Sequence, residues 1–162
     1  MATIFLTSTG FSSPAVHDAF VQESRSLERS AKIIIITTAS KQGSANPYIQ
    51  LAYKELEALG FTNISFFDLL TDTIESLKAA EIIYVGGGNT FRLLKALKDS
   101  GADQILRDFC EHNNGIYVGV SAGSLIVGQS IASAVGHDEN NVDLTDLTGL
   151  RIVPYLLLVH YT

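Results

Sequence analysis

Residues 115–124 read GIYVGVSAGS, and the interpretation of the whole chain starts from this stretch. A β-prone apolar run ends at Gly119, and Ser121 follows between small residues that lead into a predicted helix. This is the strand–turn–helix pattern G-x-S-x-G of a nucleophile elbow, a tight turn that tolerates only small side chains at its flanks. The pattern predicts an exposed Ser121 hydroxyl beside backbone N–H groups that could bind an oxyanion. The alternative is an ordinary serine in a glycine-rich turn.

Length, composition and charge restrict the class of protein. A chain of 162 residues suits one domain with a sizeable core, and 46% hydrophobic against 17% charged residues indicates a globular fold. The formal net charge is −6 and no basic cluster occurs, which argues against nucleic acid as a partner.

Targeting and redox signals are absent from the sequence. Residues 1–7 lack a basic region and a long apolar segment, so they predict a first strand and not a signal peptide. No run approaches the length of a membrane span. Cys110 is the single cysteine and excludes an internal disulfide; a packed, inert thiol is expected there. We expect a cytoplasmic protein with no membrane partner.

Strand-like and helix-like segments alternate along the chain. Strands are predicted at 4–6, 31–38, 64–67, 82–85 and 116–119, and helices at 14–27, 47–59, 73–79, 91–101, 102–112 and 122–129. Ser13 is the expected cap of the first helix, and the strand at 4–6 is expected to be buried. The alternation predicts an α/β fold with a doubly wound, mainly parallel sheet and helices on both faces.

A second glycine-rich strand end, Gly86–Gly88, follows the strand at 82–85. Sites in such sheets form beyond the carboxyl ends of the strands, so this end and the one at Ser121 are expected to share a site. The glycines could place a backbone N–H at a reacting carbonyl, or could cradle a phosphate. The phosphate fingerprint fails, because Phe91 occupies its third glycine position and the lysine of a P-loop is missing. Asn89 and Thr90 are either helix caps or substrate contacts.

A serine nucleophile needs a base, and the chain has four histidines. His17 and His112 are expected at a helix surface and a helix C-terminus. His160 ends the apolar run 153–159, so it should emerge at a strand edge, and it is favoured over His137 in the polar loop 136–148. The same apolar run has no visible covering segment, which predicts a homodimer or an aggregation-prone product. No histidine, cysteine and carboxylate spacing matches a metal site.

Three features together resemble the peptidase E family of aspartyl dipeptidases. They are IYVGGGNTF at 83–91, GVSAG at 119–123, and His160 thirty-nine positions after the serine. The resemblance covers nearly the whole chain and implies a fold like that of class I glutamine amidotransferases. It further implies Ser121 as nucleophile, His160 as general base, and the N–H groups of Gly88 and Ala122 as oxyanion hole. The implied substrate is a short peptide with an N-terminal aspartate, no cofactor is implied, and the candidate substrate-binding residues are Gly87, Asn89 and Thr90.

The sequence departs from the family pattern in three ways. The family's acidic triad member lies beyond the histidine, where this chain stops two residues later; Asp138, Glu139 or Asp143 could substitute. Val159 stands where a proline usually precedes the histidine, and Ala132 stands where aspartyl-specific members have an arginine. Without that arginine the substrate carboxylate would lose a positive partner, which weakens the expectation of a preference for aspartate.

The sequence therefore predicts a single domain over residues 1–162, without the C-terminal part of the family's domain. Its predicted activity is that of a serine peptidase acting on short peptides through a Ser121 acyl-enzyme. Two alternatives stay open: a non-catalytic relative that lacks a working triad, and an esterase-like α/β hydrolase, because acids do lie between Ser121 and His160.

Overall fold

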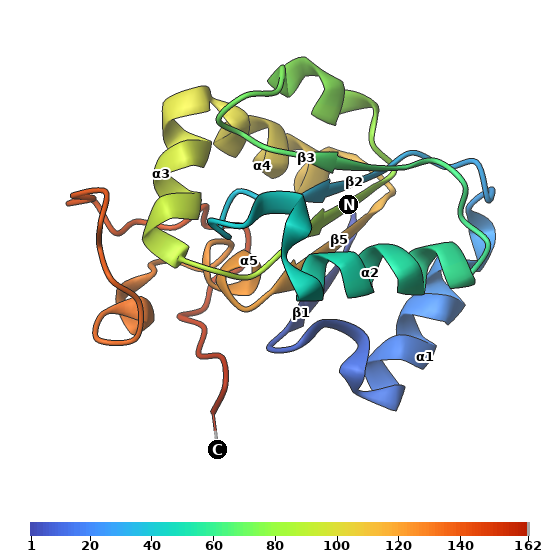
Figure 1. The fold of residues 1–162 in the computed structure, drawn as a ribbon, viewed down its shortest axis with the longest axis horizontal. Helices are drawn as coiled ribbons and strands as arrows, with labels where there is room; N and C mark the ends of the chain where they lie inside the picture. Colours follow the sequence, from blue (N-terminus) through green and yellow to red (C-terminus); the bar gives the residue numbers. More distant parts are fainter. Residues whose placement is uncertain (162) are drawn as a thin grey trace.

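A parallel sheet of five strands runs through the molecule (Figure 1), whose computed structural model describes residues 1–161. The spatial order is β1-β5-β4-β2-β3, so the strand that precedes Ser121 lies between two neighbours. Such a position holds the end of a strand firmly, because both edges carry ladder hydrogen bonds. The strand bounds are β1 Thr3–Thr7, β2 Ile33–Ile36, β3 Ile64–Phe67, β4 Ile82–Val85 and β5 Ile116–Val120.

Helices cover both faces of the sheet, as the alternation of segments predicts. Helices α1 and α2 pack on one face, and α3, α4 and α5 pack on the other. The α-helices are α1 Pro14–Glu23, α2 Pro47–Ala58, α3 Thr90–Ser100, α4 Ala102–His112 and α5 Ala122–Leu125. Short 3₁₀ helices connect them: η1 Gly10–Ser12, η2 Ser24–Ser26, η3 Gly43–Ala45, η4 Ile74–Ala79 and η5 Ala132–Ala134.

Strand β2 illustrates why the central strands are continuously apolar. Its side chains alternate between the two faces, and all four residues are buried. Ile34 and Ile36 join the core beneath α3, α4 and α5, whereas Ile33 and Ile35 join the core beneath α1 and α2. A strand with both faces covered by helices needs apolar residues at every position.

Helix boundaries follow local capping chemistry. The Asn46 side chain accepts hydrogen bonds from the first turn of α2, and Pro47 opens that helix. Gly101 adopts the left-handed conformation (φ 80°) that separates α3 from α4. Ser13 occupies the N-cap position of α1, but its side chain makes no capping hydrogen bond. The predicted position is therefore confirmed and the predicted side-chain cap is wrong.

Two predicted elements differ from those in the structure. Helix α5 ends at Leu125 and not at residue 129, because the chain after it pairs with the C-terminal part. Leu150 N–H donates to Ile126 O (2.7 Å), and Gln129 N–H donates to Tyr155 O (2.9 Å). Strand β1 is half-buried and not buried, since it forms an edge of the sheet.

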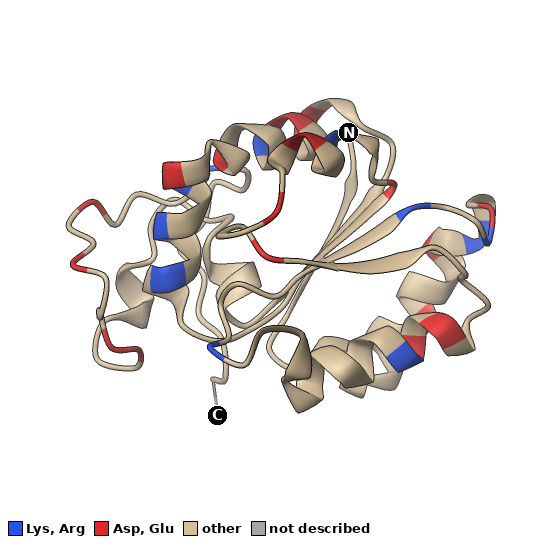
Figure 2. Cartoon of the chain, turned by 45° about the horizontal axis from the view of Figure 1, so that its top comes forward, with Lys and Arg blue, Asp and Glu red and all other residues tan. Residues whose placement is uncertain are grey.

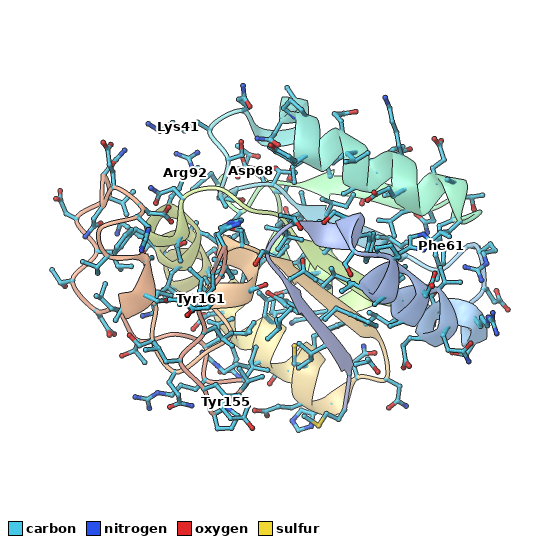
Figure 3. All side chains as sticks on the ribbon, turned by 90° about the horizontal axis from the view of Figure 1, so that it is seen from below. Lys41, Phe61, Asp68, Arg92, Tyr155 and Tyr161 are labelled. Atoms are coloured by element: carbon cyan, nitrogen blue, oxygen red, sulfur yellow. The ribbon has the colours of Figure 1, made fainter. Side chains whose placement is uncertain are left out.

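The apolar run 153–159 is not a strand, which corrects the expected strand edge at His160. It is irregular backbone that lies against the segment after α5, with Val153 N–H donating to Val127 O (3.0 Å) and Ser133 Oγ to Leu157 O (2.7 Å). Val153, Leu157 and Val159 pack on the core, while the other four residues of the run are exposed, among them Tyr155 (Figure 3). The run is therefore no uncovered sheet edge, and the homodimer stays a prediction.

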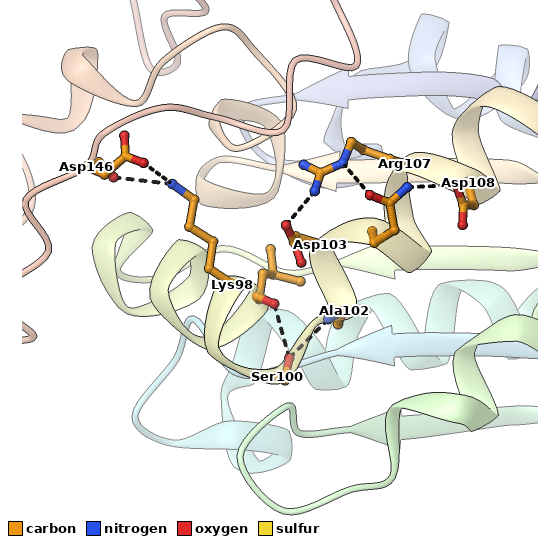
Figure 4. A network of polar contacts seen from close by, with 9 residues as sticks. Lys98, Ser100, Ala102, Asp103, Arg107, Asp108 and Asp146 are labelled. Atoms are coloured by element: carbon orange, nitrogen blue, oxygen red, sulfur yellow. Dashed lines mark hydrogen bonds and ion pairs between the residues drawn. The ribbon is translucent and has the colours of Figure 1, made fainter.

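The polar segment 136–148 is a loop in the structure, as predicted. Contacts with residues near both ends of α3 hold this loop in place. Asn89 Nδ2 donates to Glu139 O (2.7 Å) before the first turn, and Lys98 Nζ lies 3.5 Å from Asp146 Oδ2 in the last turn (Figure 4). Hydrogen bonds from Thr148 and the charge of Lys98 lower the pKa of Asp146 to about 2. Acidic positions follow one another along this loop, at the left of Figure 2.

The length and hydropathy of the helices can be compared with the requirements of a membrane span. Within residues 1–161, none of them combines the length and the apolar character that crossing a bilayer requires.

The close approach of β5 and α5 is open to a direct test with Gly119→Ala. A Cβ on Gly119 would overlap the carbonyl group of Gly123, which is backbone and cannot rotate away. We expect a loss of about 1–3 kcal/mol in the free energy of unfolding, measured by urea denaturation with circular dichroism.

Ser65→Ala, at an exposed position of β3, serves as the control and should stay within about 0.5 kcal/mol of the parent chain. Equal stability of the Gly119→Ala variant and this control would contradict the packing argument.

Candidate functional site

Ser121 stands at the carboxyl end of β5 in a backbone conformation that few residues adopt. Its φ is 52° and its ψ is −107°, directly before the first residue of α5. Hydrogen bonds on both sides hold this turn: Ser121 N–H donates to Thr7 O (2.9 Å), and Leu125 N–H donates to Ser121 O (3.0 Å). Strained backbone of this kind persists only where the surroundings fix it, and it concentrates at functional sites. The predicted strand–turn–helix around Ser121 is present.

Glycines allow this turn to pack against the neighbouring strand. A Cβ at Gly123 would overlap the carbonyl of Val85 on β4, and a Cβ at Gly119 would overlap Gly123 itself. The start of α5 thus lies directly on the ends of β4 and β5. This explains why the motif has glycine on both sides of the serine.

A buried hydrogen-bond network supports the turn from below, and sequence reasoning missed it. Ser124 Oγ accepts from Thr7 N–H (3.0 Å) and lies 2.8 Å from the carbonyl oxygens of Thr7 and Gly119. Tyr117 Oη donates to Gly123 O (2.7 Å), and burial raises the pKa of this phenol well above its usual range, so it stays a donor. The network joins β1, β5 and α5 across 117 positions of sequence, which no local pattern could indicate.

His160 reaches the serine from the C-terminal segment. Its Nε2 lies 2.9 Å from Ser121 Oγ, so the structure brings together the two residues selected from the sequence. A hydrogen bond from His160 N–H to Ser8 Oγ (3.0 Å) fixes the backbone, which has a φ of 54°. His137 makes no hydrogen bond to Ser121 among the described residues, although it lies beside the same site.

The glycine-rich end of β4 lies against the serine. A Cβ built on Gly87 would stand 3.2 Å from Ser121 Cβ, and Gly88 (φ 144°) packs on the backbone of Ala39. Within residues 1–161, the N–H groups of Gly88 and Ala122 have no hydrogen-bond partner. One of these unpaired amides follows Ser121 directly in the chain, and the other belongs to the glycine-rich end of the neighbouring strand β4; an oxyanion hole requires free N–H groups of this kind.

Asn89 is the N-cap residue of α3, and Thr90 is the first residue of that helix. Asn89 Oδ1 accepts from Arg92 N–H (2.9 Å), and Thr90 N–H donates to Asp138 Oδ2 (2.7 Å). The capping alternative is thus realised for Asn89, and a substrate contact by either residue stays a prediction. Arg92 itself turns away to Thr38 O (2.8 Å), at the end of the sheet where Figure 3 also labels Asp68.

The three acids considered as partners of His160 lie in different places. In the part of the chain that the structure describes, no carboxylate oxygen lies within 4.0 Å of a His160 ring nitrogen. Asp138 lines a cavity together with His160, and its Oδ2 is the acceptor at the start of α3. Glu139 contributes its backbone to Asn89, and Asp143 is exposed in the loop.

Two cavities meet at Ser121 and His160. The first, here named the α2-side cavity, has a volume of about 360 Å³ and includes Asn46, Tyr48 and Glu55 of the α2 region together with Gly87 and Gly88. The second, named the loop-side cavity, has about 380 Å³ and includes Thr90, Ser133, His137, Asp138, Val159 and Tyr161. Both volumes lie in the range of small-ligand sites. A substrate held at Ser121 could therefore extend in two directions.

Other reactive groups in the described chain lie outside this site. Cys110 is buried on α4, and burial raises the pKa of its thiol to about 12, in line with the expected inert thiol. No group of three histidine, cysteine, aspartate or glutamate side chains in residues 1–161 is placed to hold a metal ion.

Comparison with known proteins identifies the family. The sequence profile of peptidase family S51 matches residues 4–162. A crystal structure from Listeria monocytogenes EGD-e with a provisional peptidase E designation superposes with a TM-score of 0.84 at 33% identity, covering 99% of this chain and 80% of that one. The chain therefore belongs to peptidase family S51, and its sheet and helices form a peptidase E-like fold.

Two relatives show how much of a longer protein this chain matches. The uncharacterized peptidase Lmo0363 of Listeria monocytogenes serovar 1/2a is 33% identical over 135 residues, covering 80% of this chain and 65% of that protein. Peptidase E of Nostoc sp. (strain PCC 7120) is 30% identical over 132 residues, covering 81% of this chain and 52% of that protein. The chain thus spans about half to two thirds of the length of these relatives.

The support beneath the elbow can be tested with Ser124→Ala. Removing the hydroxyl leaves the Thr7 N–H and two carbonyls without this partner inside the protein, and an orphaned buried donor costs about 1–3 kcal/mol. We expect a loss of that size in the free energy of unfolding by urea denaturation.

The matched control is Ser26→Ala, which removes an exposed hydroxyl. The role given to Ser124 is wrong if the two variants unfold at the same urea concentration.

Proposed function

We propose that this chain is a serine peptidase that hydrolyses short peptides through a Ser121 acyl-enzyme with His160 as general base. The observation that carries the proposal is the 2.9 Å contact between Ser121 Oγ and His160 Nε2, made at a strained strand–helix turn. A serine hydroxyl becomes a competent nucleophile when a base within hydrogen-bond reach can take its proton. Membership of peptidase family S51 supports peptide bonds as the target.

In the proposed reaction, Ser121 Oγ attacks the peptide carbonyl carbon while its proton passes to His160 Nε2. The carbonyl oxygen becomes an oxyanion and accepts hydrogen bonds from the N–H groups of Gly88 and Ala122. Collapse of this intermediate breaks the C–N bond, and His160 gives its proton to the departing amine. Water then attacks the ester in the same way, and the acid product and free Ser121 result.

Asp138 is the acid that we propose as the support of His160. Of the three acids considered from the sequence, it alone lines the loop-side cavity beside the histidine. A carboxylate near the ring stabilises the imidazolium that forms when Ser121 loses its proton. Its Oδ2 already accepts the Thr90 N–H, so its position is fixed by the start of α3.

The substrate proposed here is a short peptide, and an N-terminal aspartate and contacts from Gly87, Asn89 and Thr90 remain predictions. Two cavities on either side of Ser121 give room for the groups on both sides of the cleaved bond. The name peptidase E, carried by the Nostoc relative, supports this substrate class. An esterase and a non-catalytic relative are the alternatives, and parallel assays on an ester and on an amide substrate separate them.

Ser121 is tested by labelling with a fluorophosphonate probe and mapping the adduct by mass spectrometry. We expect Ser121 to be labelled in the folded chain and Ser121→Ala to lose both labelling and peptide hydrolysis, by at least about 10³-fold. Ser44→Ala, at an exposed position of η3, should keep both. A folded parent chain whose Ser121 resists the probe would refute the proposed chemistry.

Asp138 is tested with Asp138→Asn, which keeps an oxygen for the Thr90 N–H and removes the negative charge. We expect kcat to fall about 10²–10⁴-fold with little change in unfolding. Asp143→Asn is the matched control, since Asp143 is exposed and outside the cavity and asparagine tolerates its φ of 51°. If both variants keep the parent kcat, Asp138 has no catalytic part and acts only at the start of α3.

A further inference from the structure

The α2-side cavity carries an unusual distribution of charge. Among the described residues that line it, Glu55 is the only acid and there is no lysine or arginine. The remaining walls are hydroxyls, an amide, glycines, aliphatic side chains and aromatic rings, including Tyr48 and Tyr84. Ser121 and His160 line the same cavity, so a group bound beside Glu55 can belong to a molecule that also reaches Ser121.

The Glu55 carboxylate lacks a partner. It lies half-buried on α2, and no described side chain or backbone group forms a hydrogen bond or an ion pair with it. Burial raises its pKa, and His17 on the neighbouring helix α1 opposes that effect only in part. The negative charge is also felt across the cavity, because it adds to burial in raising the pKa of Tyr84.

A half-buried carboxylate without a protein partner is only partly screened by water, so it attracts a cation that enters the cavity. The ring of Tyr48 adds a second attraction, since it is 81% exposed at the cavity and an aromatic face attracts ammonium and guanidinium groups. A carboxylate entering the same cavity would instead meet a like charge, with no lysine or arginine in the lining to neutralise it. The lining therefore favours a positively charged group over a negatively charged one in this cavity.

We propose that Glu55 is a specificity residue that binds a positively charged group of the substrate, an ammonium or guanidinium, in the α2-side cavity. This inference rests on the proposed peptidase function and names its substrate class: short peptides that place a cation beside α2. It differs from the N-terminal aspartate that the family resemblance implies. The cation could be a basic side chain or the free N-terminus of the peptide.

The test measures binding in the Ser121→Ala background, so that no hydrolysis occurs. Titration calorimetry compares Lys-Leu, Leu-Lys, norleucyl-leucine and Asp-Leu with the same peptides acetylated at the N-terminus. We expect at least one cationic group to improve affinity about tenfold over its neutral counterpart. Glu55→Gln should reduce that ratio to within about twofold, whereas Glu57→Gln, on the exposed side of α2, should keep it.

The pattern of ratios identifies the source of the cation. A lysine-over-norleucine advantage that depends on Glu55 assigns a side chain, and an advantage of free over acetylated peptides assigns the N-terminus. Unchanged ratios in Glu55→Gln, tighter binding of Asp-Leu than of Lys-Leu, or no binding of any peptide at millimolar concentration each overturn the proposal. The kcat/KM ratio of Lys and norleucine substrates, measured with Ser121 intact, is the second readout.

Failure of the proposed function gives a different result. A Ser121 that resists fluorophosphonate, with Glu55-dependent binding retained, would refute the chemistry and keep the cation site. A labelled Ser121 with binding that ignores Glu55 would refute the cation site alone.

Discussion

The contact between the start of α5 and the ends of β4 and β5 is the constraint on which the site depends. Gly123 lies on the carbonyl of Val85, and Gly119 lies under Gly123, so neither position has space for a Cβ. Because the two strands are adjacent in the parallel sheet, this contact also brings Gly87 next to Ser121. The positive φ of Ser121 follows from the need to leave the strand and enter the helix within one residue. Hydrogen bonds from Ser124 and Tyr117 then hold the turn in place.

Charge is distributed unequally around this rigid centre. On the loop side, Asp138 and His137 share a cavity with Ser121 and His160, and α3 fixes the loop that carries Asp138 and His137. On the α2 side, a single unpaired acid faces the same pair across neutral walls. We thus propose roles for two carboxylates in different cavities. Asp138 would stabilise His160, and Glu55 would bind a cationic group of the substrate. Both operate in partly buried space, where interactions between charges are stronger than in bulk water.

Much of the fold could be predicted because its signals are local. The four isoleucines of β2 and the Asn46–Pro47 start of α2 identify their elements without tertiary information. The pairing of Ser121 with His160 could also be predicted from the sequence, since a motif and a family resemblance indicated both residues. The Ser124–Thr7 contact was not, because its partners lie 117 positions apart and a serine in a helix has many roles. The run 153–159 was misjudged because an apolar run has the same composition in a strand and in half-buried irregular backbone.

The irregular backbone that delivers His160 has a consequence for how the molecule opens. Ser121 lies in a sheet and helix framework with dense buried packing. His160 lies at the end of an irregular segment, which is held by a few half-buried apolar side chains and by hydrogen bonds of its backbone to Val127 O and Ser8 Oγ. Segments of that kind detach in sub-global openings at lower free energy than the core strands. Ser121 and His160 thus belong to cooperative units of different stability. On warming, amide protons of the C-terminal segment would exchange with solvent, and His160 would move away from Ser121, while the sheet is still intact.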